Sequence, residues 1–317
     1  MSSSLRGKKV VIFGGNGFIG SHLVNYLCNE SCQVKIVSRQ EKVNKKFFFG
    51  SEPGQVTLEK IEYNEQYIDK VTDGCDIIFN LIGILYESKT SSFNFAHNKI
   101  PIMIGKCARK NKVRSLIHIS ALNVNKITNS KYAYSKSLGE AGIKKHFPEA
   151  IIVRPGVVFG KGDNFTNFFC NMSKFSPFLP LIGTPKIDLS KNLISIFNFK
   201  KKVKFQPLYV GDLAKFLTKV AGKKNKIYDL AGPSVLSFNE IFDLILNFKK
   251  RKRLYIPVPF FEAKILAFFL EFFPKPLLTR DQINLLQYDS VSSRGLSNLK
   301  SVVKNPVGIE TAISKYL

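Results

Sequence analysis

Residues 9–20 read Lys-Val-Val-Ile-Phe-Gly-Gly-Asn-Gly-Phe-Ile-Gly, in which an apolar run leads directly into a glycine-rich turn. The run 9–13 predicts a buried strand, and residues 18–29 predict a helix. The glycines of the turn include a GxxGxxG spacing. Such glycines allow a tight turn, a close approach of the main chain to a pyrophosphate, and close packing of helix on strand. The stretch therefore predicts a dinucleotide-binding unit, with phosphates on the N–H groups that open the helix.

Apolar runs and helical patterns continue to alternate through the first half of the chain. This order predicts an α/β fold of the Rossmann type, a doubly wound parallel sheet covered on both faces, with a smaller C-terminal lobe. Pro101 should kink or divide the second long helix, because proline has no N–H to donate. The expected strands are 33–38, 56–63, 76–82, 114–120 and 150–154, and the expected helices are 92–111 and 131–147.

The second half changes character and predicts a separate lobe. Residues 1–160 are assigned to the dinucleotide-binding domain, and residues 161–317 to a C-terminal substrate or partner lobe rich in Phe, Pro and Lys. The segment 205–221 is expected to return to the first domain as a strand of its sheet, an N-cap at Asp212 and a helix. Residues 165–181 are apolar and are expected to border the substrate cleft, which favours an isoprenoid-like or quinone-like ligand.

Composition narrows the classes of protein. Hydrophobic residues are 44% and charged residues 22% of the 317, which excludes a disordered or fibrous chain. The 48 Lys and Arg against 23 Asp and Glu give a net charge of +25, which favours phosphates, anionic lipid or an acidic partner. A plain solvated lysine-rich surface is the alternative. The five cysteines and four histidines lack ligand spacing, so neither a metal site nor a disulfide framework is expected.

Sequence signals for targeting are weak. The eight residues before the first strand are too few for a signal peptide, and no long uncharged apolar stretch predicts a transmembrane helix. We therefore expect a cytoplasmic protein, peripheral on the inner membrane in a bacterium, or on the matrix side if the protein is mitochondrial.

The end of the second strand indicates which dinucleotide binds. An acid there would bind the ribose 2′-hydroxyl of NAD, but the chain has Ser38 and Arg39. A guanidinium can stack on adenine and fork onto a 2′-phosphate. NADPH is therefore preferred, with NAD(H) as the alternative.

Tyr132 and Lys136 form a YxxxK pair on the predicted helix 131–147. Residues four apart share one helix face, and a nearby ammonium is expected to lower the pKa of the phenol. Such a pair can pass a proton while a nicotinamide passes a hydride. Both residues are candidate catalytic and cofactor-binding groups.

These motifs together resemble the extended or atypical short-chain dehydrogenases/reductases, which include NAD-dependent epimerases and dehydratases. Within that family the chain is similar to the nucleotide-binding accessory subunit of respiratory complex I, the NADH-ubiquinone oxidoreductase, and to its bacterial relatives. The matching segments run in order along most of the chain: Asn80–Gly83, His118–Asn123, Phe147–Val153, Arg154–Gly160, Gln206–Asp212, Gly232–Ser234 and Thr279–Asp281.

The resemblance implies a tightly bound NADPH that is mainly structural, and docking beside a membrane-associated respiratory partner, complex I or a quinone-biosynthesis assembly. It also implies that main chain at 81–83 and 155–157 approaches the ribose and nicotinamide. Asn64 is a departure, because the family commonly has an acid near the adenine, but an asparagine can still bind the adenine amine. The expected cofactor-binding residues are Gly14, Asn16, Gly17, Phe18, Ile19, Gly20, Ser38, Arg39, Asn64, Leu81, Ile82, Gly83, Ser120, Tyr132, Lys136, Pro155 and Val157.

One departure bears on activity. The family places a Ser or Thr just after the fifth strand to bind the substrate oxygen, but residues 121–123 are Ala-Leu-Asn. Ser120 precedes this position, so Ser120 and Asn123 are weaker catalytic candidates. An active NADPH-dependent reductase, or an epimerase or dehydratase, on an apolar substrate remains the alternative function.

Residues 249–273 combine a basic run, Lys-Lys-Arg-Lys-Arg, with an aromatic helix pattern. This pairing suits an anionic membrane surface or a hydrophobic partner, although the helix could instead pack on its own domain. An RNA-binding role for the basic run is a weaker alternative, because no aromatic-interleaved RNA motif accompanies it, and nucleic acid is not the expected partner.

Overall fold

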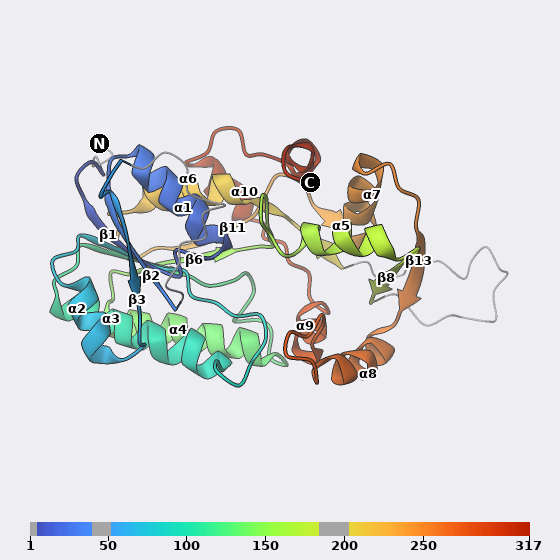
Figure 1. Cartoon of the computed structure of the whole chain (residues 1–317), viewed down its shortest axis with the longest axis horizontal. Helices are drawn as coiled ribbons and strands as arrows, with labels where there is room; N and C mark the ends of the chain where they lie inside the picture. Colours follow the sequence, from blue (N-terminus) through green and yellow to red (C-terminus); the bar gives the residue numbers. More distant parts are fainter. Residues whose placement is uncertain (1–4, 40–51, 184–202) are drawn as a thin grey trace.

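The computed structural model describes residues 5–39, 52–183 and 203–317. A seven-stranded sheet in the order β3-β2-β1-β4-β5-β6-β11 dominates it, and every neighbouring pair is parallel (Figure 1). The predicted α/β fold with a doubly wound parallel sheet is confirmed. The strands are β1 (Lys9–Phe13), β2 (Gln33–Ser38), β3 (Val56–Lys60), β4 (Ile77–Asn80), β5 (Ser115–Ile119), β6 (Ile151–Pro155) and β11 (Ile227–Leu230).

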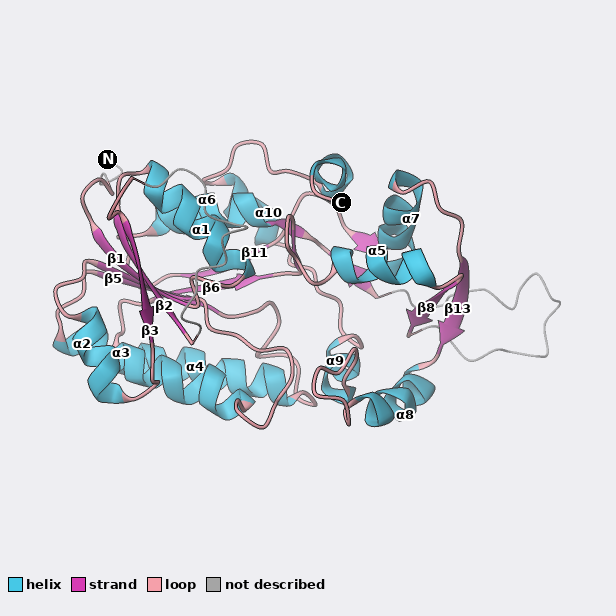
Figure 2. Cartoon of the chain, in the orientation of Figure 1, coloured by secondary structure: helices cyan, strands magenta, loops and turns pink. Residues whose placement is uncertain are grey.

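Helices cover both faces of the sheet (Figure 2). Successive β1 residues point to opposite faces, so Val10 and Ile12 join one buried cluster and Val11 and Phe13 join the other. This explains why the strands read as continuous apolar runs. One layer contains α1 (Phe18–Asn29), α6 (Val210–Val220) and α10 (Gly295–Lys300), and the other contains α2 (Glu65–Thr72), α3 (Ile100–Lys110) and α4 (Lys131–His146).

The expected helix 92–111 is present as one helical run over residues 93–110, and its α-helical pattern is interrupted just before Pro101. Phe95–Lys99 forms a π-helical turn, η1, and the α-helical α3 begins only at Ile100. Pro101 lies in the first turn of α3, directly after the π-helical turn, and as a proline it donates no N–H to the preceding turn. The π-helical turn shifts His97 away from regular α-helical spacing.

The return of residues 205–221 differs from expectation in its strand. β10 (Leu208–Tyr209) pairs with β7 (Val158–Phe159) in a separate two-stranded sheet and does not join the large one. α6 begins at Val210, so Asp212 is not its N-cap; the carboxylate instead accepts a bond from Val307 N–H. α6 does pack beside α1. β11 also belongs to the large sheet, and α10 packs against it.

The rest of the C-terminal half forms a lobe around a phenylalanine cluster. Phe165 and Phe169 pack ring to ring against Phe205, Phe238 and Phe242, so these two side chains of the apolar stretch 165–181 belong to the core of the lobe. The elements here are α5 (Thr166–Phe175), β8 (Phe178–Ile182), β9 (Lys204–Phe205), β12 (Leu236–Ser237), α7 (Phe238–Phe248), β13 (Leu254–Val258), α8 (Phe260–Leu270), α9 (Arg280–Leu285), α11 (Ile309–Ala312) and η2 (Ile313–Lys315).

Helix α4 approaches η1 closely because residue 139 is glycine. A Cβ on Gly139 would lie 1.9 Å from the main-chain oxygen of His97, whereas a Cβ on Gly142 would meet only the Ile102 side chain, at 2.4 Å. A main-chain oxygen cannot rotate away, but an isoleucine side chain can change rotamer. A side chain at position 139 would therefore push α4 away from η1, whereas one at position 142 would require only a new rotamer of Ile102.

We expect Gly139→Ala to lower the free energy of unfolding by about 2–3 kcal/mol, because α4 must move away from η1. Gly142→Ala, the matched control, should change it by less than about 1 kcal/mol, since higher helix propensity offsets the repacking of Ile102. Urea unfolding of both variants measures the difference. Equal effects would show that the main-chain contact does not fix α4.

Candidate functional site

The glycine turn between β1 and α1 has the shape that a pyrophosphate requires. Gly14 has φ of +81°, and Gly17 N–H donates to Gly14 O at 3.0 Å. A Cβ on Gly20 would lie 2.4 Å from Gly14 O and 2.5 Å from Gly15 Cα, so only glycine lets α1 start this close to the turn. The residues between, Asn16, Phe18 and Ile19, are partly exposed at the helix start.

Helix α1 leaves its first N–H groups available for an anion. Gly17 is the N-cap and has no side-chain cap, and the first turn has no acid. Ser21 N–H is bonded to Gly17 O, so the N–H groups of residues 18–20 precede the first intrahelical bond. With the positive end of the helix dipole they form a fitting cradle for phosphate.

Ser38 and Arg39 lie at the end of β2, at the same edge of the sheet as the glycine turn. Ser38 is the buried last residue of β2, and Arg39 is exposed just beyond it. Burial raises the pKa of Tyr63, and the Arg39 guanidinium opposes that rise, which places the cation beside the β3–α2 connection. The guanidinium is therefore open to solvent near the expected adenosine end of the site.

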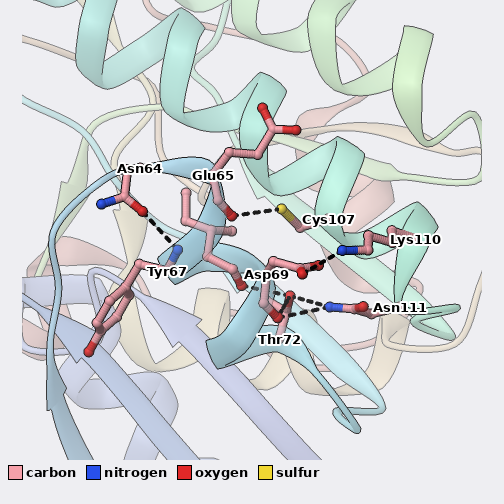
Figure 3. A network of polar contacts seen from close by, with 9 residues as sticks. Asn64, Glu65, Tyr67, Asp69, Thr72, Cys107, Lys110 and Asn111 are labelled. Atoms are coloured by element: carbon pink, nitrogen blue, oxygen red, sulfur yellow. Dashed lines mark hydrogen bonds and ion pairs between the residues drawn. The ribbon is translucent and has the colours of Figure 1, made fainter.

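Asn64 has a structural task that the sequence did not indicate. Its Oδ1 accepts a bond from Tyr67 N–H at 2.8 Å and so caps α2 (Figure 3). Polar contacts tie α2 to α3, with Lys110 Nζ 2.6 Å from Asp69 and Asn111 Nδ2 bonded to Asp69 O and Thr72 Oγ1. Asn64 is thus held in place at the expected adenine end of the site.

The turn after β4 is organised by buried Asn80. Its Oδ1 accepts from Ile82 N–H at 3.2 Å, and its Nδ2 lies 3.0 Å from His118 Nδ1 on the neighbouring strand β5. These bonds hold Leu81, Ile82 and Gly83 against the glycine turn, where a Cβ on Gly14 would meet Leu81 C at 3.2 Å. The two main-chain segments expected to contact the nucleotide therefore lie side by side.

Lys136 reaches into this edge of the sheet from α4. Its Nζ donates to Ile119 O at 3.1 Å and to Ile82 O at 3.3 Å, and it lies 3.4 Å from the place of a Cβ on Gly83. Burial lowers the pKa of Lys136 to about 8, although the Glu140 carboxylate raises it. Glu140 is itself held by Arg154, with Oε1 2.9 Å from Nε.

Tyr132 lies in an aromatic pocket. Its ring meets the rings of His97 and Phe93 edge on, with centroids 5.2 and 5.9 Å apart. Burial raises the pKa of Tyr132 to about 12, and the Asp281 carboxylate adds to the rise. The expectation that a neighbouring ammonium lowers this pKa is wrong, because burial and a carboxylate both favour the neutral phenol.

His97 supports Tyr132, a role that sequence reasoning missed. Its Nε2 accepts from Ile84 N–H at 3.0 Å, and its Nδ1 lies 2.9 Å from Ser135 Oγ, which donates to Tyr132 O. These contacts require the neutral ring with its proton on Nδ1. Burial, reinforced by the Lys136 charge, lowers the pKa of His97 to about 2.

Asp281 is the second residue that sequence reasoning missed in this role. From α9 it accepts bonds from Ser130 Oγ at 2.8 Å, Lys131 N–H at 2.7 Å and Tyr132 N–H at 3.1 Å. It therefore caps the N-terminus of α4 from a distant part of the chain. The Thr279-Arg280-Asp281 segment was the only signal, and it carried no information about this contact.

The remaining candidate residues differ in whether their side chains already have hydrogen-bond partners. Within the described part of the chain, the buried Ser120 Oγ has no hydrogen-bond partner. Asn123 is engaged, since its Nδ2 donates to Asp289 O at 2.9 Å. Pro155 ends β6 and is buried, and Val157 follows, half-buried.

Together these groups fit a dinucleotide. The glycine cradle fits a pyrophosphate, Arg39 fits a 2′-phosphate, and the orphaned Ser120 Oγ and the Lys136 ammonium lie where ribose and nicotinamide are expected. Among the described residues, no group of His, Cys, Asp and Glu is placed to hold a metal ion. The site can therefore hold a dinucleotide, and Tyr132 could serve as a proton donor.

We expect Asp281→Asn to lower the free energy of unfolding by about 1–2 kcal/mol, because the cap of α4 is weakened. The pKa of Tyr132 should fall at the same time, since a carboxylate that favours the neutral phenol is removed. Urea unfolding and tyrosine-labelled NMR titration measure the two effects. Asp73→Asn, at an exposed position, is the control, and an unchanged Tyr132 titration would refute the contact.

Lys136 should make stability depend on pH. Its folded pKa of about 8 lies below the ordinary 10.5, so between these values the unfolded chain binds more protons and the free energy of unfolding rises with pH. Without nucleotide, the stability of Lys136→Met relative to the unsubstituted protein should therefore be greater at pH 7 than at pH 10. Lys145→Met, exposed on the same helix, should show no such change. A pH-independent difference for Lys136→Met would contradict the burial of the ammonium.

The chain is similar to known proteins in sequence and in fold. Mitochondrial NADH dehydrogenase (ubiquinone) 1 alpha subcomplex subunit 9 of Mus musculus is 28% identical over 314 residues, which are 97% of this chain and 79% of that protein. Ceramide reductase of Caulobacter vibrioides is 28% identical over 183 residues, 58% of this chain and 56% of that protein.

Among solved structures, the Citrobacter triphenylmethane reductase complexed with NADP(H) has a TM-score of 0.72 at 14% identity, covering 97% of this chain and all of that one. Residues 10–231 match the family described as NAD dependent epimerase/dehydratase. The match spans the glycine turn, the YxxxK helix and all seven strands of the large sheet, and the chain therefore belongs to the NAD-dependent epimerase/dehydratase family.

Proposed function

We propose that this protein is an NADPH-holding accessory subunit of respiratory complex I, in which the nucleotide serves mainly to stabilise the fold. One observation carries the structural role: residues 121–123 have no hydroxyl, and the Asn123 amide that could replace it donates to Asp289 O. Because this proposal assigns the Ser120 hydroxyl to the nucleotide, a carbonyl substrate would lack the second donor that polarises its oxygen, a loss that typically costs about 10²–10³ in rate.

The nucleotide-binding part of the proposal rests on complementary chemistry. The N–H groups at the start of α1 would hold the pyrophosphate, and Arg39 would fork onto the 2′-phosphate. Lys136 would donate to the ribose hydroxyls, and Ser120 Oγ would gain the partner that it lacks. NADPH supplies a hydride donor when bound. The protein's own groups orient it and exclude water around Tyr132.

The association with complex I is supported by the relatives. The mouse protein, similar along 97% of this chain, is named as a subunit of NADH dehydrogenase (ubiquinone). We infer the same kind of assembly for this chain, at the inner-membrane surface. A relation to quinone biosynthesis is the less supported form of the same proposal.

A second function, NADPH-dependent reduction of an apolar substrate, is favoured by one observation. A ceramide reductase is similar over 183 residues, and Tyr132 and Lys136 are both present. Tyr132, a neutral phenol, would donate a proton to the carbonyl oxygen. In that case Tyr132→Phe abolishes turnover while nucleotide stays bound.

We expect the purified protein to carry one NADPH per chain, and removal of NADPH to lower the melting temperature. Arg39→Ala should weaken NADPH binding at least tenfold, the loss of about one charge-assisted bond, and leave NADH binding nearly unchanged. Arg114→Ala, at another exposed arginine, is the control. Native mass spectrometry and calorimetry measure both effects.

Two outcomes would contradict the proposal. Equal loss of NADH and NADPH binding in Arg39→Ala would remove the 2′-phosphate contact. Turnover of about 1 s⁻¹ or faster with any ceramide, quinone or aldehyde offered would contradict a mainly structural nucleotide and would support the reductase function instead.

A further inference from the structure

The C-terminal lobe exposes an apolar helix that the nucleotide site does not explain. α8 buries only Ala263 and Ala267, which pack beside Ile283 of α9. Large aromatic side chains on the opposite side are left in solvent, with Phe261 72% and Phe272 75% exposed. We call this surface the α8 face and define it as Phe261, Ile265, Phe268, Phe269, Phe272 and Phe273.

The side chains of the α8 face gather on one side because of their spacing. Phe261, Ile265 and Phe268 recur at intervals of four and three residues, which places them in one row of α8. Phe269 lies beside this row, and Phe272 and Phe273 follow in the turn after the helix ends at Leu270. A monomer seldom leaves so large a continuous apolar surface in water, and such surfaces mark binding sites for protein or lipid.

The position of α8 indicates a broad, flat partner. The helix lies at the outer edge of the lobe, with α9 on its inner side (Figure 1). The apolar residues continue past the helix end, where Leu277 is 65% exposed. This surface projects outward. It therefore fits a flat layer that side chains can enter better than it fits a narrow groove on a protein.

The charged side chains around the α8 face indicate that the layer is anionic. Arg280 has its guanidinium carbon 5.1 Å from the centre of the Phe268 ring, Lys264 lies on α8 itself, and Lys275 is exposed in the following turn. Of the two acids, Glu271 at the helix end is paired with Arg280 at 2.8 Å, and Glu262 lies exposed in the first turn of α8. The whole chain carries +25, so anionic headgroups are attracted over the entire approach.

No helix of the described residues is long and apolar enough to cross a membrane. α8 has 11 residues and spans about 16 Å, about half of a hydrocarbon core. It has the length and composition of a helix that lies in the plane of the interface. We propose that the α8 face binds the headgroup–acyl boundary of an anionic lipid bilayer, as a surface separate from the nucleotide site.

The test is flotation of the full-length, NADPH-loaded protein with vesicles of phosphatidylcholine alone and of phosphatidylcholine with 30 mol% phosphatidylglycerol. We expect at least tenfold stronger binding to the anionic vesicles at low salt, weakened by added NaCl. Phe272→Ser should lower the partition coefficient about tenfold, because one aromatic side chain no longer leaves water. Tyr134→Ser, an aromatic residue 63% exposed on α4, is the matched control and should leave binding unchanged.

Three results would overturn the proposal: no binding to either vesicle, equal binding to both, or equal loss in Phe272→Ser and Tyr134→Ser. Concentration-dependent dimers that Phe272→Ser abolishes, without vesicle binding, would assign the α8 face to a second copy of the chain. Because Phe272 lies outside the nucleotide site, retention of NADPH in each variant separates this result from failure of the proposed function.

Discussion

The position of α4 is the constraint on which the rest of the site depends. The helix carries both Tyr132 and Lys136, and a single missing Cβ at Gly139 lets it contact the main chain of η1. Its first turn is capped by Asp281, and its middle is anchored by the buried pair of Glu140 and Arg154. With the helix held on three sides, the Lys136 ammonium lies against the carbonyls of Ile82, just beyond β4, and of Ile119, at the end of β5.

That arrangement buries three polar side chains beside one another in the site. The phenol of Tyr132 and the ring of His97 are both held neutral by burial, and the Lys136 ammonium is shared between two main-chain oxygens. The neutral phenol keeps its proton near neutral pH, and the ammonium is positioned to donate hydrogen bonds to a bound group. A nucleotide held in such surroundings would add contacts between α1, the β4 turn and α4, which is how a bound group stabilises a fold without reacting.

The sequence predicts much of the fold because the deciding signals are local. The glycine turn, the apolar strands and the YxxxK spacing each lie within a few residues, and all were found where expected. Helix α2 was left unassigned although Asn64 and Glu65 provide a cap and an acidic first turn, since it is only eight residues long. Asp281 and the pairing of β10 with β7 could not be predicted, because each depends on contacts between distant segments that no local pattern encodes.

The edge strand β11 has a consequence for how the protein is made. β6 ends at Pro155, but its outer neighbour β11 begins only at Ile227, and the helix that covers it, α10, begins at Gly295. While the ribosome is still producing the intervening residues, β6 has an open edge that can pair with another nascent chain. The large sheet is therefore complete only once translation has passed Leu230, and α10 can cover β11 only near the end of translation. A chain terminated before residue 227 would leave the edge of β6 open.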